Sequence, residues 1–173
     1  PISQTSASIK KGNRKSEVAL REAEVWGTLA SLKGFAYPLQ RMDAAWKRLL
    51  LNQFHDILPG SSIARVYVEA RKDHQWIISE ANNVQKDAQS VLAKGDGVTV
   101  FNSLSFDREE VIALPEAFSD GAQTLEGMPV PVEASGSGVL ALVRVPAMGA
   151  VSLRPAKEKA KGPRVCAMLT KTG

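Results

Sequence analysis

The sequence predicts an α+β protein in which a three-helix antiparallel bundle precedes a small antiparallel β-sheet or partial β-sandwich. Up to residue 94, apolar side chains recur at spacings of three and four, as on one face of a helix. After Gly95 they form short runs separated by Gly, Pro, Asn and Ser, which is typical of strands and turns. We therefore expect a helical bundle at 1–94, a β-strand domain at 95–155, and a linker with the start of a further β region at 156–173.

The first helix is indicated by four apolar residues spaced four, three and four apart. They are Ala19, Ala23, Trp26 and Ala30. We expect this helix to end near Gly34, because glycine readily adopts the left-handed conformation that terminates helices. Residues 1–12 are rich in Ser, Thr and Lys, and we expect them to be irregular.

Two further helices follow on either side of the Pro59-Gly60 turn. The second is expected from about Gln40 to His55, with a buried stripe of Met42, Ala45, Trp46, Leu49 and Leu50. The third is expected to run for roughly 30 residues, about 45 Å, with an apolar face of Ile63, Val66, Tyr67, Ala70, Ile77, Ala81, Val84, Ala88, Val91 and Leu92. Short turns between amphipathic helices favour an antiparallel bundle.

The β region contains five short β-prone runs, at residues 98–101, 110–114, 128–132, 138–145 and 150–153. Five strands would leave one face or an edge of a sheet exposed, so we expect a further element to cover it. Residues 155–163 are polar and charged, which favours a loop or linker. Residues 164–173 resemble the start of another strand pair.

Composition restricts the function classes. The net charge of +4 arises in residues 1–21. This segment contains one acidic residue, Glu17, and five basic ones: Lys10, Lys11, Arg14, Lys15 and Arg21. No aromatic platform accompanies these basic residues, so a nucleic-acid binder is the least favoured class. The single cysteine, Cys166, excludes an internal disulfide. Because we find neither a secretory signal nor an apolar run of about 20 residues, we expect a cytoplasmic protein that does not cross a membrane.

The pair His55-Asp56 is the candidate functional feature, because it lies where an apolar helix ends before Pro59. In one interpretation, His55 hydrogen-bonds the last helical carbonyls and complements the helix dipole. In the other, His55 is a metal ligand or proton carrier and Asp56 holds a substrate hydroxyl. The two residues alone leave both interpretations open. The other histidine, His74, is expected to be an ordinary residue of a helix face.

Residues 45–62, AWKRLLLNQFHDILPGSS, resemble a signature of glycoside hydrolase family 38, the α-mannosidases. Three weaker matches stand in the family's order around it: residues 13–24, 100–105 and 143–149. Together the resemblance covers most of the chain. The matched parts are the family's middle helical domain and the first strands of its C-terminal β region.

This resemblance implies an enzyme that hydrolyses α-D-mannosidic bonds with retention, using two carboxyl groups and a divalent metal, zinc or another such as cobalt. It assigns His55 to a metal-ligand position and Asp56 to a substrate-binding position. The catalytic residues and the other ligands would belong to an N-terminal barrel that this sequence does not contain. We therefore expect a fragment that is inactive alone, whose partners are that barrel, a C-terminal β domain and an α-mannoside or oligosaccharide substrate.

A second hypothesis assigns the chain to a different class of function, a binding module and not a part of an enzyme. The chain could be a non-catalytic helical and β module that binds carbohydrate or a partner protein. This hypothesis predicts a stable, cooperative monomer whose sugar binding survives both a chelator and loss of His55. The fragment hypothesis predicts marginal stability and at best weak metal binding through His55, since one imidazole is a poor site.

Overall fold

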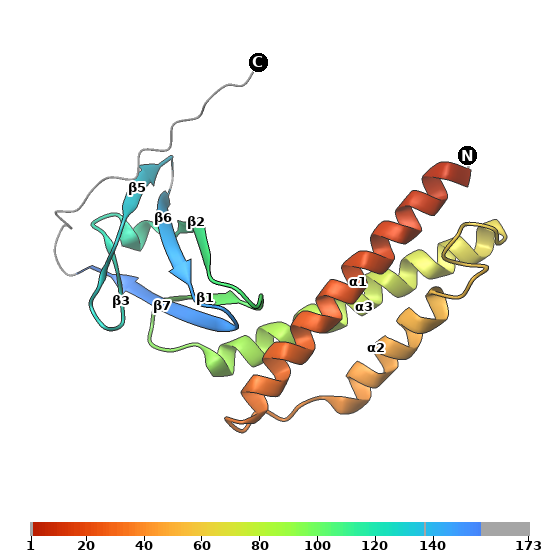
Figure 1. Cartoon of the computed structure of the whole chain (residues 1–173), viewed down its shortest axis with the longest axis horizontal. Helices are drawn as coiled ribbons and strands as arrows, with labels where there is room; N and C mark the ends of the chain where they lie inside the picture. Colours follow the sequence, from red (N-terminus) through yellow and green to blue (C-terminus); the bar gives the residue numbers. More distant parts are fainter. Residues whose placement is uncertain (1, 137, 157–173) are drawn as a thin grey trace, which may run out of the picture. The chain divides into compact units, whose positions relative to one another are not determined.

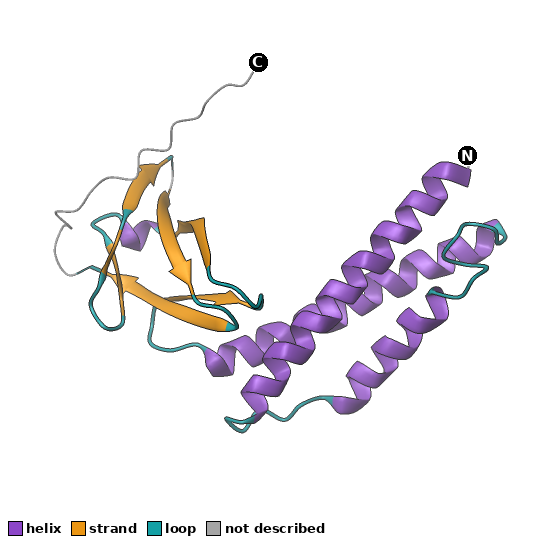
Figure 2. Cartoon of the chain, viewed as in Figure 1, coloured by secondary structure: helices purple, strands orange, loops and turns teal. Residues whose placement is uncertain are grey.

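The structure is a computed structural model that describes residues 2–136 and 138–156. It divides into two compact units, Pro1–Leu92 and Ala93–Gly173. The first unit is helical and the second consists mainly of strands, which confirms the α+β class (Figure 2). Of the linker and further β region expected at 156–173, residues 157–173 lie outside the described residues. No helix within the described ranges is long and apolar enough to span a lipid bilayer.

The helical unit contains α1 (Ile2–Ser31), α2 (Leu39–Asn52) and α3 (Ala64–Leu92). Helix α2 runs back along α1 and α3, and α1 packs closely along α3 (Figure 1). The core combines residues from all three helices: Ala19, Leu20, Ala23, Met42, Ala45, Leu49, Ile77, Ala81 and Val84. Each helix therefore buries most of the stripe that its sequence predicts, and α3 has nearly the expected length, at 29 residues. The predicted stripes are wrong at three positions, because Leu50 and Val91 are exposed and Ile63, also exposed, precedes α3.

Helix α1 begins at Ile2, so the expectation that residues 1–12 are irregular is wrong. The buried positions Ile9, Asn13, Ser16 and Leu20 continue the helical spacing of four, three and four toward the N-terminus. Two of these four residues are polar, which hides the stripe from an analysis based on apolar residues alone. Ile9 completes the packing, because it contacts a separate small cluster on α3.

The C-terminus of α1 confirms the role predicted for Gly34. The amide of Gly34 donates to the Ser31 carbonyl at 3.1 Å, and the amide of Phe35 donates to the Ala30 carbonyl at 3.1 Å. Gly34 has a φ of 90°, which a residue with a side chain rarely adopts. This is the Schellman arrangement, and it satisfies carbonyls that the helix end would otherwise leave unpaired.

Helix α2 ends at Asn52, three residues before the predicted end at His55. The side-chain amide of Asn52 donates back to the Arg48 carbonyl at 2.9 Å, a type of bond that competes with helix continuation. Gln53 then caps the helix, its backbone amide donating to the carbonyls of Leu49 and Leu50. His55 therefore lies in the turn after α2 and not on its last turn.

In residues 93–136 and 138–156, the β unit contains seven strands and a short 3-10 helix. They are β1 (Val98–Asn102), β2 (Arg108–Leu114), η1 (Glu116–Phe118), β3 (Ala122–Thr124), β4 (Pro129–Val130), β5 (Val132–Ser135), β6 (Gly138–Val145) and β7 (Gly149–Pro155). A four-stranded sheet has the order β1-β7-β3-β4, and a three-stranded sheet has the order β2-β6-β5. All the strand pairs are antiparallel.

The number of strands differs from the expected five for two reasons. Strand β3 has only three residues, too few to show alternation. The single run expected at 128–132 is divided at Pro131 into β4 and β5, which belong to different sheets. The core contains residues of both sheets, including Ala122, Leu153 and Val143, so one face of each sheet packs against the other. Whether a further element covers the sheet edges stays a prediction.

Candidate functional site

The candidate site is the turn that carries His55 and Asp56 after α2. The His55 Nε2 and Asp56 Oδ2 atoms are 3.6 Å apart, and the two side chains are 78% and 59% exposed. The ring of Phe54 lies beside the imidazole, with 4.1 Å between centroids. In the described part of the chain, no hydrogen bond joins the His55 ring to a carbonyl of α2, so the capping interpretation has no support in this geometry.

Two side-chain amides fix the chain just before this turn. Asn52 donates to Asp73 of α3, with 3.1 Å between Nδ2 and Oδ2. Gln53 donates to Glu17 of α1, with 3.0 Å between Nε2 and Oε1. Consecutive residues are thus tied to two different helices.

The chain after the pair is fixed by apolar contacts. Ile57 and Leu58 pack against the small cluster formed by Ile9, Tyr67 and Ala70. Farther along, the Ser62 backbone amide donates to the Tyr67 hydroxyl. The turn is therefore attached to the bundle on both sides of His55, while the His55 and Asp56 side chains face solvent.

The donor set does not form a complete metal site. Residues 2–136 and 138–156 contain no group of three or more His, Cys, Asp or Glu side chains placed to hold a metal ion. Zinc sites in proteins use three or four protein ligands, whereas this turn offers one imidazole and one carboxylate. The turn by itself therefore offers fewer donor groups than a zinc site needs.

His74 is separate from this turn and has a different environment. It is buried within the bundle, and its Nδ1 lies 3.0 Å from the Ser16 hydroxyl of α1. Burial lowers the pKa of its imidazole, and the Asp73 carboxylate partly opposes that shift. Its other nitrogen, Nε2, has no hydrogen-bond partner in the part of the chain that the structure describes. His74 lies on a helix face as expected, and it is the face directed into the bundle.

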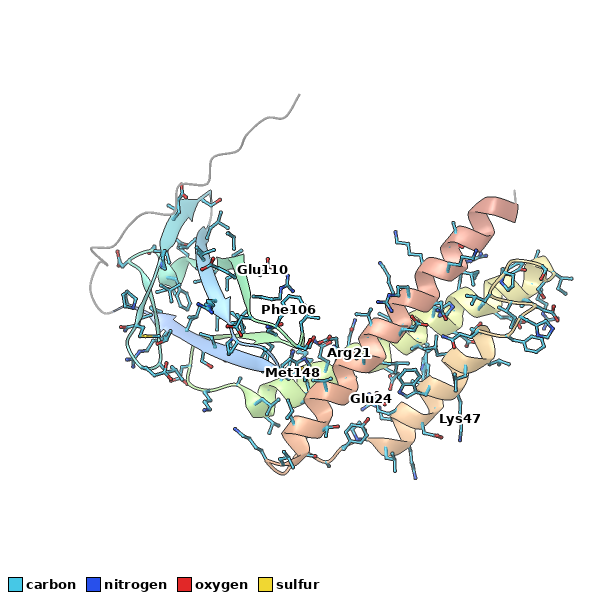
Figure 3. The ribbon with its side chains drawn as sticks, in the orientation of Figure 1. Arg21, Glu24, Lys47, Phe106, Glu110 and Met148 are labelled. Carbon is cyan, nitrogen blue, oxygen red and sulfur yellow. The ribbon has the colours of Figure 1, made fainter. Side chains whose placement is uncertain are left out.

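The indole nitrogen of Trp46 donates to Glu24 of α1 at 2.8 Å, which joins α1 to α2. Figure 3 labels Glu24 on α1 and shows Lys47 on the outer side of α2. Trp76 is partly buried against the core and carries the Arg48 guanidinium 4.0 Å above its ring. These tryptophans have structural partners within the bundle, which was the expectation for Trp46.

The helical unit matches a known family. The family model described as the α-mannosidase middle domain matches residues 4–92, more than half of the chain. The chain belongs to the α-mannosidase middle-domain family. The match includes the whole turn with His55 and Asp56, and it confirms the resemblance identified from residues 45–62.

Curated relatives extend the likeness into the β unit. The chain is 36% identical over 157 residues to alpha-mannosidase 2C1 of Homo sapiens, covering 87% of this chain and 14% of that protein. It is 35% identical over 151 residues to alpha-mannosidase 2C1 of Mus musculus, covering 84% of this chain and 13% of that protein. The chain therefore spans about a seventh of the length of these relatives.

Solved structures show the same fold in larger proteins. A glycosyl hydrolase family 38 protein from Enterococcus faecalis matches with a TM-score of 0.69 and 18% identity, over 94% of this chain and 26% of that one. An α-mannosidase from Enterococcus faecalis V583 matches with a TM-score of 0.68 and 17% identity, over 94% and 25%. Both likenesses concern the fold, and both cover the bundle together with the β unit.

Proposed function

We propose that this chain is the middle part of an α-mannosidase that hydrolyses α-D-mannosidic bonds with retention. In this proposal His55 supplies one ligand to a divalent metal and Asp56 contacts the substrate. The observation that carries it is the solvent-facing His55-Asp56 pair on a turn of the family's middle domain. The metal would be zinc or another divalent ion such as cobalt, and it would orient sugar hydroxyls when bound.

The remaining catalytic groups would come from an N-terminal barrel. Retaining hydrolysis requires two carboxyl groups about 5–5.5 Å apart around the sugar, one as nucleophile and one as acid/base. This chain contributes neither in our proposal, since Asp56 is assigned to substrate binding. The active site would therefore form only when the barrel packs against the turn after α2. The isolated chain would be inactive.

Exposed apolar side chains near the pair in the sequence support such a contact. Leu50, Leu51, Phe54 and Ile63 are large apolar residues with at least about half of their surface exposed. Exposed apolar side chains that form a patch are typical of surfaces that another domain or protein covers. We propose that the barrel packs against these residues and brings its ligands to His55.

A second candidate function is a non-catalytic module that binds carbohydrate or a partner protein. The observation in its favour is that each unit has a hydrophobic core of its own, as an independent module requires. This candidate predicts sugar binding by the chain that is unaffected by chelator or by His55→Ala.

The proposed function is tested by an assay and by the coding frame. The isolated chain should show no metal-dependent turnover of an aryl α-mannoside, and robust turnover would refute its inertness. The reading frame that contains this chain should encode an upstream barrel with further Asp and His ligands. A cytoplasmic location remains a separate prediction, to be checked by cell fractionation.

A further inference from the structure

We propose that Glu17 of α1 and Asp73 of α3 are positioning residues that hold the turn carrying His55 in place. The proposal rests on the proposed function of His55 and deepens it. Neither carboxylate would touch metal or substrate. Each would act through an amide side chain shortly before the candidate ligand in the sequence. Glu17 would act through Gln53, two residues before His55, and Asp73 through Asn52, three residues before it.

The Glu17 carboxylate is oriented by three donors. Its Oε1 atom accepts hydrogen bonds from Gln53 and from Asn13, each at 3.0 Å. Its Oε2 atom accepts from Arg14 at 3.2 Å. Hydrogen bonds to an ionised group are stronger than those between neutral groups. Glu17 therefore presents a fixed acceptor to Gln53, two residues before His55.

The Asp73 carboxylate is held in a similar way on the other side. Its Oδ2 atom accepts from Asn52 at 3.1 Å, and its Oδ1 atom lies 3.5 Å from the Arg48 guanidinium. The same guanidinium stacks on Trp76, which limits its movement. Asn52 is only 2% exposed, so loss of its acceptor would leave a buried amide without one of its partners.

The His55 side chain depends on these anchors because it has few restraints of its own. It is largely exposed, its ring lies beside that of Phe54, and its Nε2 atom lies 3.6 Å from Asp56 Oδ2; both residues belong to the same turn. Metal ligands must be held to within about 0.5 Å of the productive position by the residues around them. The anchors at Asn52 and Gln53 therefore determine where the imidazole can point.

The test compares variants of the full 173-residue chain by NMR. Glu17→Ala and Asp73→Ala should each speed hydrogen exchange of the Phe54, Ile57 and Leu58 amides about tenfold, the effect of losing one charge-assisted hydrogen bond. These amides form the turn's own bonds, to the carbonyls of Leu51 and Phe54. The His55 ring signals should shift as well, because the imidazole would move relative to Phe54.

Two kinds of control separate positioning from general stability. Glu80→Ala removes a 2.9 Å ion pair between α3 and Arg41 of α2, which is not attached to the turn, and it should leave the turn amides and the His55 signals unchanged. Glu17→Gln and Asp73→Asn keep an acceptor oxygen and should restore most of the protection.

The proposal would be overturned if Glu80→Ala changed the exchange rates of the turn amides as much as Glu17→Ala and Asp73→Ala do. Faster exchange confined to the turn would support it. Neither result requires bound metal, so this test is independent of the proposed function. The two proposals can fail separately. If Glu17→Ala and Asp73→Ala speed exchange of the turn amides while His55→Ala leaves metal content and activity intact in the assembled enzyme, the positioning role of Glu17 and Asp73 is supported and the metal role of His55 is refuted.

Discussion

Ser16 of α1 and His74 of α3 form a buried hydrogen bond, with 3.0 Å between Oγ and Nδ1. The other ring nitrogen, Nε2, has no hydrogen-bond partner within the described residues. Protonation of the imidazole would place a charge between two packed helices. Burial accordingly lowers the pKa of the His74 imidazole below its usual value of 6.5.

We expect the helical unit to lose stability as the pH falls below about 6.5. There the unfolded chain gains a proton at His74 while the folded chain, with its lowered pKa, does not. The free energy of unfolding then decreases by at most about 1.4 kcal/mol per pH unit for this one group. Urea denaturation of the wild type and of His74→Gln at pH 7.5 and pH 5.5 checks this. The variant should show the weaker pH dependence, and equal dependence would contradict the account.

The β unit should depend on the buried side chain of Asn102. Its Nδ2 atom donates to the carbonyls of Phe106 at 2.8 Å and Pro146 at 3.0 Å, and its Oδ1 atom accepts from the Leu104 amide at 3.0 Å. Asn102→Ala should lower the free energy of unfolding of this unit by about 2–3 kcal/mol, because buried backbone groups lose their partners.

Asn102→Asp should be more damaging than Asn102→Ala, since a carboxylate would face carbonyl oxygens in place of a donor. Gln123→Ala is the control within the same unit, because its amide forms one exposed hydrogen bond, at 3.4 Å to Pro155. It should change stability by less than about 0.5 kcal/mol. Thermal unfolding measures the stability of all three variants. A smaller loss of stability in Asn102→Asp than in Asn102→Ala would be inconsistent with the contacts of the Asn102 side chain.

Gly97 should not tolerate a side chain. A Cβ atom added there would lie 1.8 Å from the Leu153 carbonyl oxygen, so backbone would have to move. We expect Gly97→Ala to cost about 1–3 kcal/mol of stability in the β unit. Gly138→Ala is the matched control, because its Cβ would approach the Leu114 carbonyl oxygen only to 3.2 Å. Chemical denaturation compares the two, and an equal or smaller loss for Gly97→Ala would contradict this packing.

The parts of the fold with apolar periodicity could be predicted from the sequence. The buried positions Met42, Ala45 and Leu49 of α2, the length of α3 and the ending of α1 at Gly34 follow from apolar spacing and glycine conformation. The same spacing wrongly included Leu50, which is exposed. The first turns of α1 could not, because their buried stripe includes the polar residues Asn13 and Ser16. A polar residue is recognised as buried only when its partner is known, and the partner of Ser16 is 58 residues away.

The family could be recognised from the residues around the candidate site, whereas the contacts that hold this turn in place could not be predicted. The signature around His55 and Asp56 led to the family, which the match over residues 4–92 confirms. The contacts of Glu17 with Gln53 and of Asp73 with Asn52 join residues 36 and 21 positions apart, and no local pattern reveals them. They depend on how the three helices pack, which the structure provides.

In our proposal, His55 is one ligand of a metal site completed by groups outside this chain. The most direct measurement is the metal content and aryl α-mannoside turnover of the longer protein encoded by this reading frame, as wild type, His55→Ala and the control Lys47→Ala. We predict about one metal ion per molecule in the wild type and the control. His55→Ala should lose bound metal, and its turnover should fall at least about a hundredfold. Full metal content and wild-type turnover in His55→Ala would contradict the claim.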